Sequence, residues 1–336
     1  MSSVPRLKNK TLHDVARSAG VSLMTASRAI SQPELVAKET REKVMLAVQV
    51  TGYIPNRLAG GLKSQRSHTV AALVPVISVP QFLPTIQTLT EVLEQAGYQL
   101  IVGQTGYDRA REAALLNTML SRRVDGIVMA GLLQPGDAAQ KLTQLGIPVV
   151  ETWDMTERPV DTVVGFSHVK VGSAVAGYFL SKGWHRVGLA TGDDQRATLR
   201  REGFLSVMGR EVPTAIVKAP ASVQLGRQAL GEVLRQDPLV RAVFCSSDGM
   251  AQGVLIEAQV RGIRVPEELA VLGFGGAEFS AHLSPSLSTV QVDGAAIGVH
   301  AAELILARCQ GKPVAQRIVD IGFQIVERES TMVSNS

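Results

Sequence analysis

The chain of 336 residues contains only two cysteines, Cys245 and Cys309. Their separation matches no metal site and they form no disulfide framework, so we expect both to be buried, reduced thiols. No apolar run approaches the roughly 18 residues that cross a bilayer, and the N-terminus lacks the apolar segment of a signal peptide. These absences predict a cytoplasmic protein that does not associate with a membrane.

Sequence motifs of catalysis are also missing. The chain contains no GxxxxGK[ST], GxSxG or HExxH, and its six histidines never approach metal-ligand spacing. The stretch "GFGGAEF" (Gly273–Phe279) has two glycines at dinucleotide-binding spacing, but Glu278 occupies the third position, which favours a tight turn after a strand. We therefore expect no enzyme activity, no cofactor and no metal.

Positive charge is concentrated at the N-terminus. Residues 1–66 hold 11 Lys and Arg against 4 Asp and Glu, whereas the remaining residues hold 23 against 26. This asymmetry favours a polyanion-binding segment attached to a nearly neutral body, although a solvated basic face would have the same composition.

The stretch "DVARSAGVSLMTASRAI" predicts two short helices around one glycine. Thr11 and Asp14 form a capping pattern for the first helix, Gly20 ends it, and Ser22 caps the second. A third helix is predicted over residues 38–50. Two crossing helices joined by a glycine turn are typical of a helix-turn-helix, which places its second helix in the major groove of DNA; a plain helical bundle is the alternative.

The stretch "GYIPNRLAGGLKS" follows the third predicted helix. Gly60 and Gly61 would each cost a helix here about 1 kcal/mol relative to alanine, so a helix would form only against a partner such as DNA. A flexible linker is the alternative.

These N-terminal motifs resemble the DNA-binding head and hinge of the LacI family of bacterial repressors. The resemblance, which continues nearly to the C-terminus, implies a head (residues 1–53), a hinge (54–66) and a two-lobed effector-binding and dimerisation body (67–336). It also implies a homodimer on operator DNA, with Leu62 wedged between base pairs of the minor groove. The residues implied to contact DNA are Ser22, Leu23, Met24, Thr25, Ser27, Arg28, Tyr53, Asn56 and Leu62.

Two positions depart from the family pattern. Leu23 and Met24 stand where several members carry polar side chains, so Thr25, Ser27 and Arg28 are expected to supply most hydrogen bonds, with apolar contacts to thymine methyl groups. Ala37 replaces a common capping serine, which should weaken the start of the third helix by about 1 kcal/mol.

From residue 69 onward, short β-rich runs alternate with helical segments. This alternation predicts an α/β body with parallel sheets, and the number of strands favours two lobes. The resemblance implies a periplasmic-binding-protein-like body whose chain crosses between the lobes three times, which we place near residues 165, 293 and 322. The predicted strands are 69–76, 98–105, 124–130, 147–153, 161–166, 185–192, 214–219, 242–247 and 269–274.

Ligands of such sheets bind at the carboxyl ends of the strands, so polar residues there are candidates for an effector site. Arg196 and Arg200 follow one strand four residues apart and suit a carboxylate, and the resemblance implies that Arg200 is a ligand contact. The resemblance makes Asp248 a hydrogen-bond acceptor for sugar hydroxyls, but a helix N-cap is the alternative. Glu151, Trp153 and Asp154 end another strand without a clear role.

Three further positions belong to the predicted effector site. Phe82 matches an apolar wall of the family's pocket, or is simply core. Ser167 and His168 fall where many members have Asp and Asn, which removes a negative charge and favours an anionic ligand. His168 is a candidate donor to that ligand, although a surface histidine is the safer expectation.

The stretches "PVVETWD", "VVGFSH", "VFCSSD" and "LAVLGFGG" resemble the gluconate-utilisation repressors within the family. The resemblance implies a transcriptional repressor of sugar-acid catabolism genes that a sugar acid, such as gluconate, releases from its operator. The alternatives are a regulator that answers another sugar or phosphosugar, and a sugar-binding transport protein with the same body.

Overall fold

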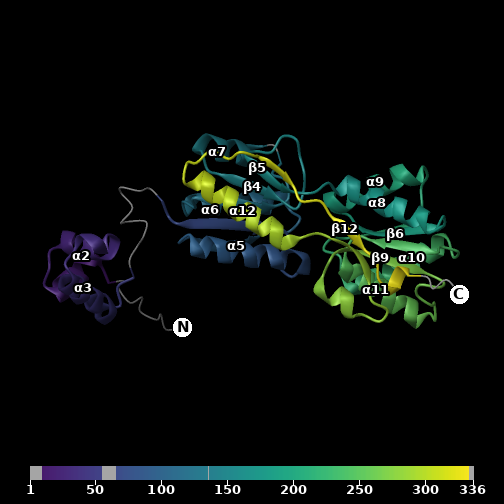
Figure 1. Cartoon of the computed structure of the whole chain (residues 1–336), viewed down its shortest axis with the longest axis horizontal. Helices are drawn as coiled ribbons and strands as arrows, with labels where there is room; N and C mark the ends of the chain where they lie inside the picture. Colours follow the sequence, from purple (N-terminus) through teal and green to yellow (C-terminus); the bar gives the residue numbers. More distant parts are fainter. Residues whose placement is uncertain (1–9, 55–65, 135, 333–336) are drawn as a thin grey trace, which may run out of the picture. The chain divides into compact units, whose positions relative to one another are not determined.

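The computed structural model describes residues 10–54, 66–134 and 136–332, and its contacts divide the chain into two compact units, residues 1–67 and 68–336. Figure 1 shows the helical first unit and the α/β second unit. The predicted hinge contacts Asn56 and Leu62 lie outside the described residues.

The first unit is a three-helix head. Its elements are α1 (Leu12–Ala19), α2 (Leu23–Ser31), the short 3-10 helix η1 (Pro33–Leu35) and α3 (Lys38–Thr51). The backbone N–H and hydroxyl of Thr11 donate to the Asp14 carboxylate at 2.8 and 2.9 Å, so the predicted capping box is confirmed. Gly20 ends α1 with a φ of +65°, a left-handed conformation that glycine adopts without strain.

A small apolar core holds the three helices together. This core contains one fully buried residue from each helix: Val15, Ala26 and Val44. Ser22 caps α2 by accepting a hydrogen bond from the N–H of Thr25 at 3.1 Å, whereas Ala37 at the start of α3 makes no side-chain cap, as predicted. The head therefore has the predicted helix-turn-helix geometry.

The first lobe of the body is a parallel sheet covered by helices on both faces. Helices α5 and α12 pack against each other on one face, and α6 and α7 lie together on the other. The sheet has the order β11-β5-β4-β3-β1-β2. Its elements are β1 (Thr69–Val74), η2 (Pro80–Phe82), α5 (Leu83–Gln95), β2 (Gln99–Gln104), α6 (Arg109–Ser121), β3 (Gly126–Ala130), α7 (Asp137–Leu145), β4 (Val149–Thr152), β5 (Thr162–Gly165), α12 (Gly294–Cys309) and β11 (Ile318–Asp320).

The second lobe repeats this three-layer arrangement, with α8 packed on α9 and α10 packed on α11. Its sheet has the order β12-β10-β9-β8-β6-β7 and is parallel except for the antiparallel pairing of β12 with β10. Its elements are α8 (His168–Ser181), β6 (Val187–Gly192), α9 (Gln195–Met208), β7 (Thr214–Val217), α10 (Val223–Gln236), β8 (Ala242–Cys245), α11 (Asp248–Val260), β9 (Ala270–Gly275), η3 (Glu278–His282), β10 (Ser288–Gln291), β12 (Gln324–Val326) and η4 (Glu329–Thr331).

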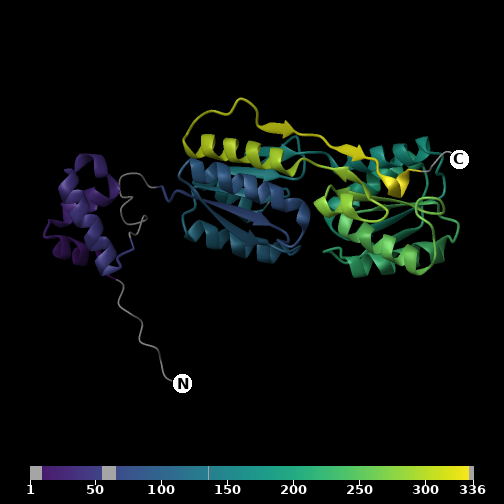
Figure 2. The ribbon, with the colours of Figure 1, turned by 60° about the horizontal axis from the view of Figure 1, so that its bottom comes forward.

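Three crossings join the lobes, as the resemblance implied. They lie between β5 and α8, between β10 and α12, and between β11 and β12, at residues 165–168, 291–294 and 320–324. Figure 2 shows the last crossing as the yellow chain that runs from one lobe to the other. The three crossings bring the carboxyl ends of the strands of both sheets to one junction.

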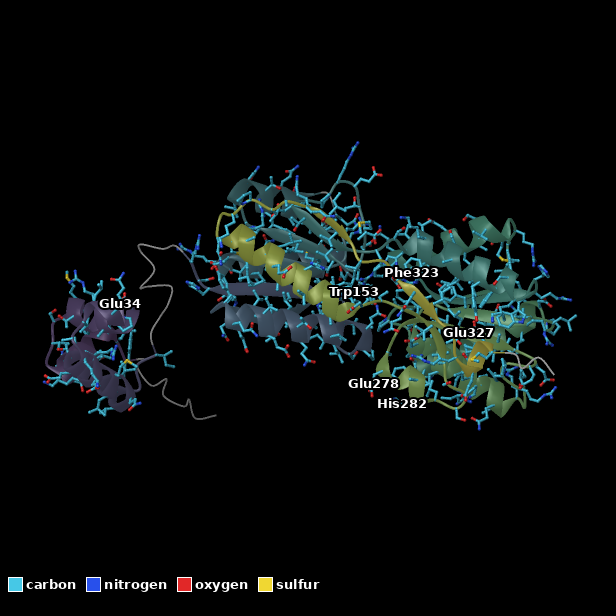
Figure 3. All side chains as sticks on the ribbon, viewed as in Figure 1. Glu34, Trp153, Glu278, His282, Phe323 and Glu327 are labelled. Carbon is cyan, nitrogen blue, oxygen red and sulfur yellow. The ribbon has the colours of Figure 1, made fainter. Side chains whose placement is uncertain are left out.

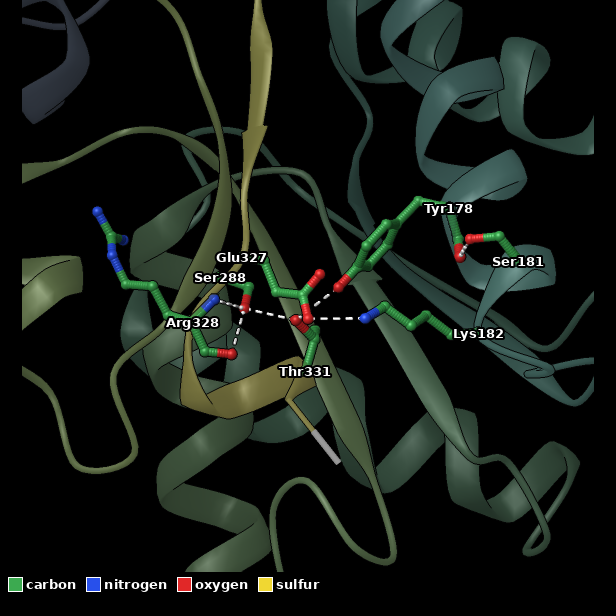
Figure 4. A network of polar contacts seen from close by, with 7 residues as sticks. All are labelled: Tyr178, Ser181, Lys182, Ser288, Glu327, Arg328 and Thr331. Atoms are coloured by element: carbon green, nitrogen blue, oxygen red, sulfur yellow. Dashed lines mark hydrogen bonds and ion pairs between the residues drawn. The ribbon is translucent and has the colours of Figure 1, made fainter. Parts of the chain in front are cut away.

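Polar contacts fix the chain after its third crossing to the second lobe (Figure 4). Lys182 on α8 forms an ion pair of 2.7 Å with Glu327, and the Tyr178 hydroxyl donates to the Thr331 hydroxyl at 2.9 Å. Thr331 also lies 2.6 Å from the hydroxyl of Ser288 on β10. These contacts join a helix, a central strand and the final segment of the chain, so the last crossing is anchored at its end in the second lobe.

All nine predicted strands are present, but β10, β11 and β12 were not predicted. Each has only three or four residues, and β11 and β12 lie at the edges of their sheets, where half-exposed residues give no continuous apolar run. Within the described ranges, no helix is both long enough and apolar enough to span a membrane.

Candidate functional sites

The second helix of the head presents a mixed surface to solvent. Leu23 and Met24 are 39% and 64% exposed, although both are apolar, and Arg28 is also exposed. Exposed apolar side chains at the start of a helix gain nothing from water, whereas thymine methyl groups in a major groove would cover them. The face that carries them is opposite to the buried Ala26 and Ala29.

Two of the predicted DNA contacts, Ser22 and Thr25, are also hydrogen-bonded to each other within the head. The hydroxyl of Thr25 lies 2.8 Å from the hydroxyl of Ser22, so the cap of α2 already uses both side chains. Ser27 is half-buried. The Tyr53 ring packs against the core of the head and is likewise half-buried. Arg28 is the one charged donor among the predicted contacts on α2, and it is exposed.

A cavity of about 450 Å³ lies at the junction of the two lobes of the body. Residues from both sheets line it, including Phe82, His168, Arg196, Arg200, Asp248 and Phe274. Five of the six predicted effector-site residues are therefore brought together, although they are separated by up to 166 positions in the sequence. The volume is in the range of sites that hold small molecules.

Arg196 and Arg200 stand on the first turns of α9, which Asp194 caps. Arg200 is 5% exposed, and burial lowers its pKa from 12.5 to about 10, so it remains cationic at neutral pH. Among the described residues, only Arg196 Nη1 and Arg200 Nε are buried side-chain nitrogen or oxygen atoms without a hydrogen-bond partner. Buried donors of this kind are rare in folded proteins, and two in one cavity indicate a site for an acceptor.

His168 is buried, and the expectation of a surface histidine is wrong. It is 2% exposed, lies edge-to-face with Phe166, and its Nδ1 is 2.9 Å from Arg200 Nη1. Burial, together with the charge of Arg200, lowers the pKa of His168 well below 6.5. Its position at the start of α8, directly after the first crossing, carries the ring into the lobe junction instead of outward.

Aromatic rings form one wall of the cavity. Phe82 lies edge-to-face with Trp153 at a centroid distance of 5.2 Å, and it is 2% exposed. Phe82 is thus both core and pocket wall, so the two interpretations of this residue are compatible. Trp153 has a φ of +62°, which is rare for a bulky residue, and its indole N–H donates to the Thr85 hydroxyl at 3.0 Å. Figure 3 shows Trp153 where the first lobe meets the second.

Asp248 is not the N-cap of α11, because Ser247 is. The Asp248 carboxylate instead accepts hydrogen bonds of 2.6 Å from the Thr289 hydroxyl and from the N–H of Ala277. Burial raises its pKa to about 6. These bonds join the start of α11 after β8, the turn after β9 and the start of β10 beside the cavity that Asp248 lines.

Two other polar residues have structural contacts. Ser167 does not line the cavity, and its hydroxyl caps α8 by accepting from the N–H of Lys170. Glu151 accepts hydrogen bonds from the N–H groups of Leu133 and Val160 at 2.7 and 2.9 Å, which holds two loops of the first lobe. Glu151 therefore positions backbone and does not face the cavity that the arginines line.

Comparison with known proteins agrees with both parts of this architecture. Residues 11–56 match the family model of bacterial regulatory proteins of the lacI family, and residues 176–331 match a periplasmic binding protein-like domain. The HTH-type transcriptional regulator GntR of Pseudomonas aeruginosa is 37% identical over 96% of this chain and 95% of its own length. The chain belongs to the LacI family. It is a DNA-binding transcriptional repressor, and not an enzyme.

Other LacI-family proteins are similar over nearly the whole chain. The HTH-type transcriptional regulator IdnR of Escherichia coli is 32% identical over 94% of this chain and 96% of its own length. The crystal structure of a LacI-family transcriptional regulator from Silicibacter pomeroyi is 32% identical, covers 96% of this chain and 99% of its own, and has a TM-score of 0.89. The predicted fold class, a helix-turn-helix head on a periplasmic-binding-protein-like body, is thereby confirmed.

Several cavity residues of this LacI-family chain were not predicted. Tyr107 follows β2, Ser246 follows β8, and Phe274 lies near the end of β9, so all three stand at carboxyl ends of strands. That shared position is a signal available in the sequence, but single aromatic or serine residues there do not stand out without the fold. A neighbouring cavity of about 380 Å³ shares Tyr107 and Arg196 with the first and adds Asp154 to its lining.

Proposed function

We propose that this chain is a homodimeric repressor of sugar-acid catabolism genes, which releases its operator when gluconate or a related acid binds the cavity of the body. The observation that carries the proposal is the pair of buried, unpartnered guanidinium nitrogens on Arg196 and Arg200. A carboxylate accepts from two guanidinium groups through charge-assisted hydrogen bonds, which a neutral sugar cannot match. The similarity to regulators named GntR and IdnR supports the same class of ligand.

The remainder of the cavity suits the hydroxyl-bearing part of a sugar acid. The Asp248 carboxylate and the Ser246 side chain belong to the lining, and carboxylate and hydroxyl oxygens have lone pairs that suit the hydroxyl groups of a sugar. The Phe82 and Phe274 rings, over which the Arg196 and Arg200 guanidinium groups lie at 5.5 and 4.0 Å, add the apolar part of the lining that suits the C–H groups of a sugar. A ligand with a carboxylate at one end and hydroxyl groups along its carbon backbone is an aldonic acid.

The position of the cavity also provides a means of release. Its walls come from both lobes, so a ligand that contacts both favours one arrangement of the lobes over another. Binding changes operator affinity only to the extent that the ligand prefers the released state. We propose the head at residues 1–53, the hinge at 54–66 and the body at 67–336, with the hinge carrying the change to DNA through Leu62. We also propose a cytoplasmic location, because an operator-binding protein must reach chromosomal DNA.

The proposal is tested by retention and release of DNA. Fragments from upstream of the gene and its neighbours are bound to the full-length protein at fixed salt, since phosphate contacts make affinity steeply salt-dependent. Gluconate, 2-ketogluconate, idonate and 6-phosphogluconate are then added separately. Specific retention followed by release with one of these acids is the expected result. Retention that every acid leaves unchanged contradicts the proposed effector, and no specific retention contradicts the whole proposal.

A further inference from the structure

Every direct partner of the Arg200 guanidinium in the described structure is uncharged. Its Nη1 pairs with His168 Nδ1 at 2.9 Å, its Nη2 donates to the carbonyl of Ser246 at 3.1 Å, and its carbon lies 4.0 Å from the centre of the Phe274 ring. No salt bridge of the described residues includes Arg200 or Arg196. The positive charge is thus held in place without being neutralised.

The hydrogen bonds of His168 fix its chemical form. Its Nε2 lies 3.0 Å from the carbonyl oxygen of Trp153, which only accepts, while the guanidinium at Nδ1 only donates. Nε2 must therefore carry the proton and Nδ1 must carry the lone pair, which is the neutral imidazole. The low pKa of His168 agrees with this form. A protonated histidine would have no lone pair to offer Arg200.

The other neighbours of His168 are aromatic. Its ring lies 4.8 Å from Phe166 and 6.0 Å from Phe274, measured between centroids, and Trp153 is held by Thr85. The titratable groups that act on Arg200 from further away are the charged Asp194, Arg196 and Asp154 and the neutral Tyr107, and among the described residues none forms an ion pair with it. His168 is thus the side chain that hydrogen-bonds to Arg200 directly, so the residue at position 168 sets whether Arg200 has a neutral or an anionic partner within the protein.

We propose that His168 is a positioning residue that selects the charge of the effector. As a neutral acceptor it orients Arg200 but leaves the positive charge and the Nε donor for an anionic ligand. A carboxylate at the same position would pair with Arg200 inside the protein, so a ligand carboxylate would then meet a neutralised site. The inference rests on the proposed function, because it assigns the charge preference of the same cavity.

The test compares two ligands that differ only at one carbon. Gluconate carries a carboxylate where glucitol carries a neutral hydroxymethyl group, and calorimetry measures the affinity of the full-length protein for each. For the wild type we expect gluconate to bind about 10- to 100-fold more tightly than glucitol, from charge-assisted hydrogen bonds. His168→Asp should remove that preference, whereas His168→Asn, which offers a neutral acceptor, should retain it.

Each outcome has one meaning. Wild type that binds no sugar acid refutes the proposed function itself, whereas wild type that prefers gluconate together with a His168→Asp variant that keeps the preference refutes the role of His168. Thermal unfolding and operator binding establish that the variants are folded. If His168→Asp does not fold, His168→Asn and His168→Leu decide: loss of the preference in the Asn variant, or its full retention in the Leu variant, overturns the inference.

Discussion

In the head, the candidate DNA contacts stand side by side on α2 and face solvent, whereas in the body the candidate ligand contacts come from distant segments and are buried. Both Arg28 and Arg200 stand on helices, but Arg28 is exposed to solvent whereas Arg200 is only 5% exposed. DNA binding and ligand binding therefore depend on different levels of structure. A side chain that contacts DNA is positioned by the helix that carries it. A side chain that contacts the ligand is positioned by the packing of the whole body.

The largest effect is expected from removing Arg200, a buried ligand contact of the body. Arg200→Ala deletes a buried charge-assisted donor, so we expect gluconate affinity to fall by about 100-fold or more while operator affinity changes little. The neighbouring Arg201→Ala is the matched control, since Arg201 lines neither cavity. Calorimetry and operator binding at one salt concentration provide both values. A normal operator response to gluconate in Arg200→Ala would mean that the pocket lies elsewhere.

Removing Arg28 tests the other side of the comparison. Arg28→Ala should weaken operator binding by about 10- to 100-fold and reduce discrimination between operator and unrelated DNA, because a base contact carries about 1–3 kcal/mol. Lys43→Ala removes the same charge from the exposed surface of α3. We expect that control to change the salt dependence and not the discrimination. Equal effects of both variants would show that Arg28 acts only as a charge.

The pH dependence of stability tests the burial of His168 in the body. The folded-state pKa of His168 lies well below its ordinary value of 6.5, so below that pH the unfolded chain binds more protons and the free energy of unfolding falls. One such histidine contributes up to about 1.4 kcal/mol per pH unit. The stability of the wild type relative to His168→Asn should therefore drop by about 1 kcal/mol between about pH 6.5 and 5.5, measured by denaturant unfolding. A constant difference contradicts a buried neutral histidine.

The smallest expected effect concerns the start of α3. Ala37 makes no side-chain cap, so Ala37→Ser should supply an acceptor for the N–H of Thr40 and stabilise the first turn by about 1 kcal/mol. Hydrogen exchange at that amide in the full-length protein should slow about fivefold. Ala37→Val, which adds no acceptor and is as poor an N-cap residue as alanine, is the control. Unchanged exchange in the serine variant would show that the turn is held by other contacts.

Prediction from sequence succeeded where the signal is local. The capping box of Thr11 and Asp14, the glycine that ends α1 and the apolar runs of the nine strands each lie within a few residues, and each is present. The pairing of Arg200 with His168 joins residues 32 positions apart through a chain crossing, and no local pattern indicates it. His168 was expected at the surface because a lone histidine is usually solvated, and only the fold places it between two aromatic rings.

The polar contacts of Asp248 show the same limit. The sequence offers it as a helix cap or as a ligand acceptor, but its bonds run to Thr289 and Ala277 on other segments. Trp153, which the sequence placed near the cleft without a role, connects Thr85, His168 and the cavity wall. Tertiary hydrogen bonds of this kind depend on sheet order and crossings, which a single sequence does not encode locally.

The central claim is that the cavity of the body and the operator are energetically coupled. The most direct test measures operator affinity of the full-length protein by fluorescence anisotropy at fixed salt, with and without saturating gluconate, and gluconate affinity with and without operator. Thermodynamic linkage predicts that both affinities fall by the same factor, which for regulated proteins is about 5- to 150-fold. Tight gluconate binding that leaves operator affinity unchanged would contradict the coupling, and with it the account of this protein as a repressor released by a sugar acid.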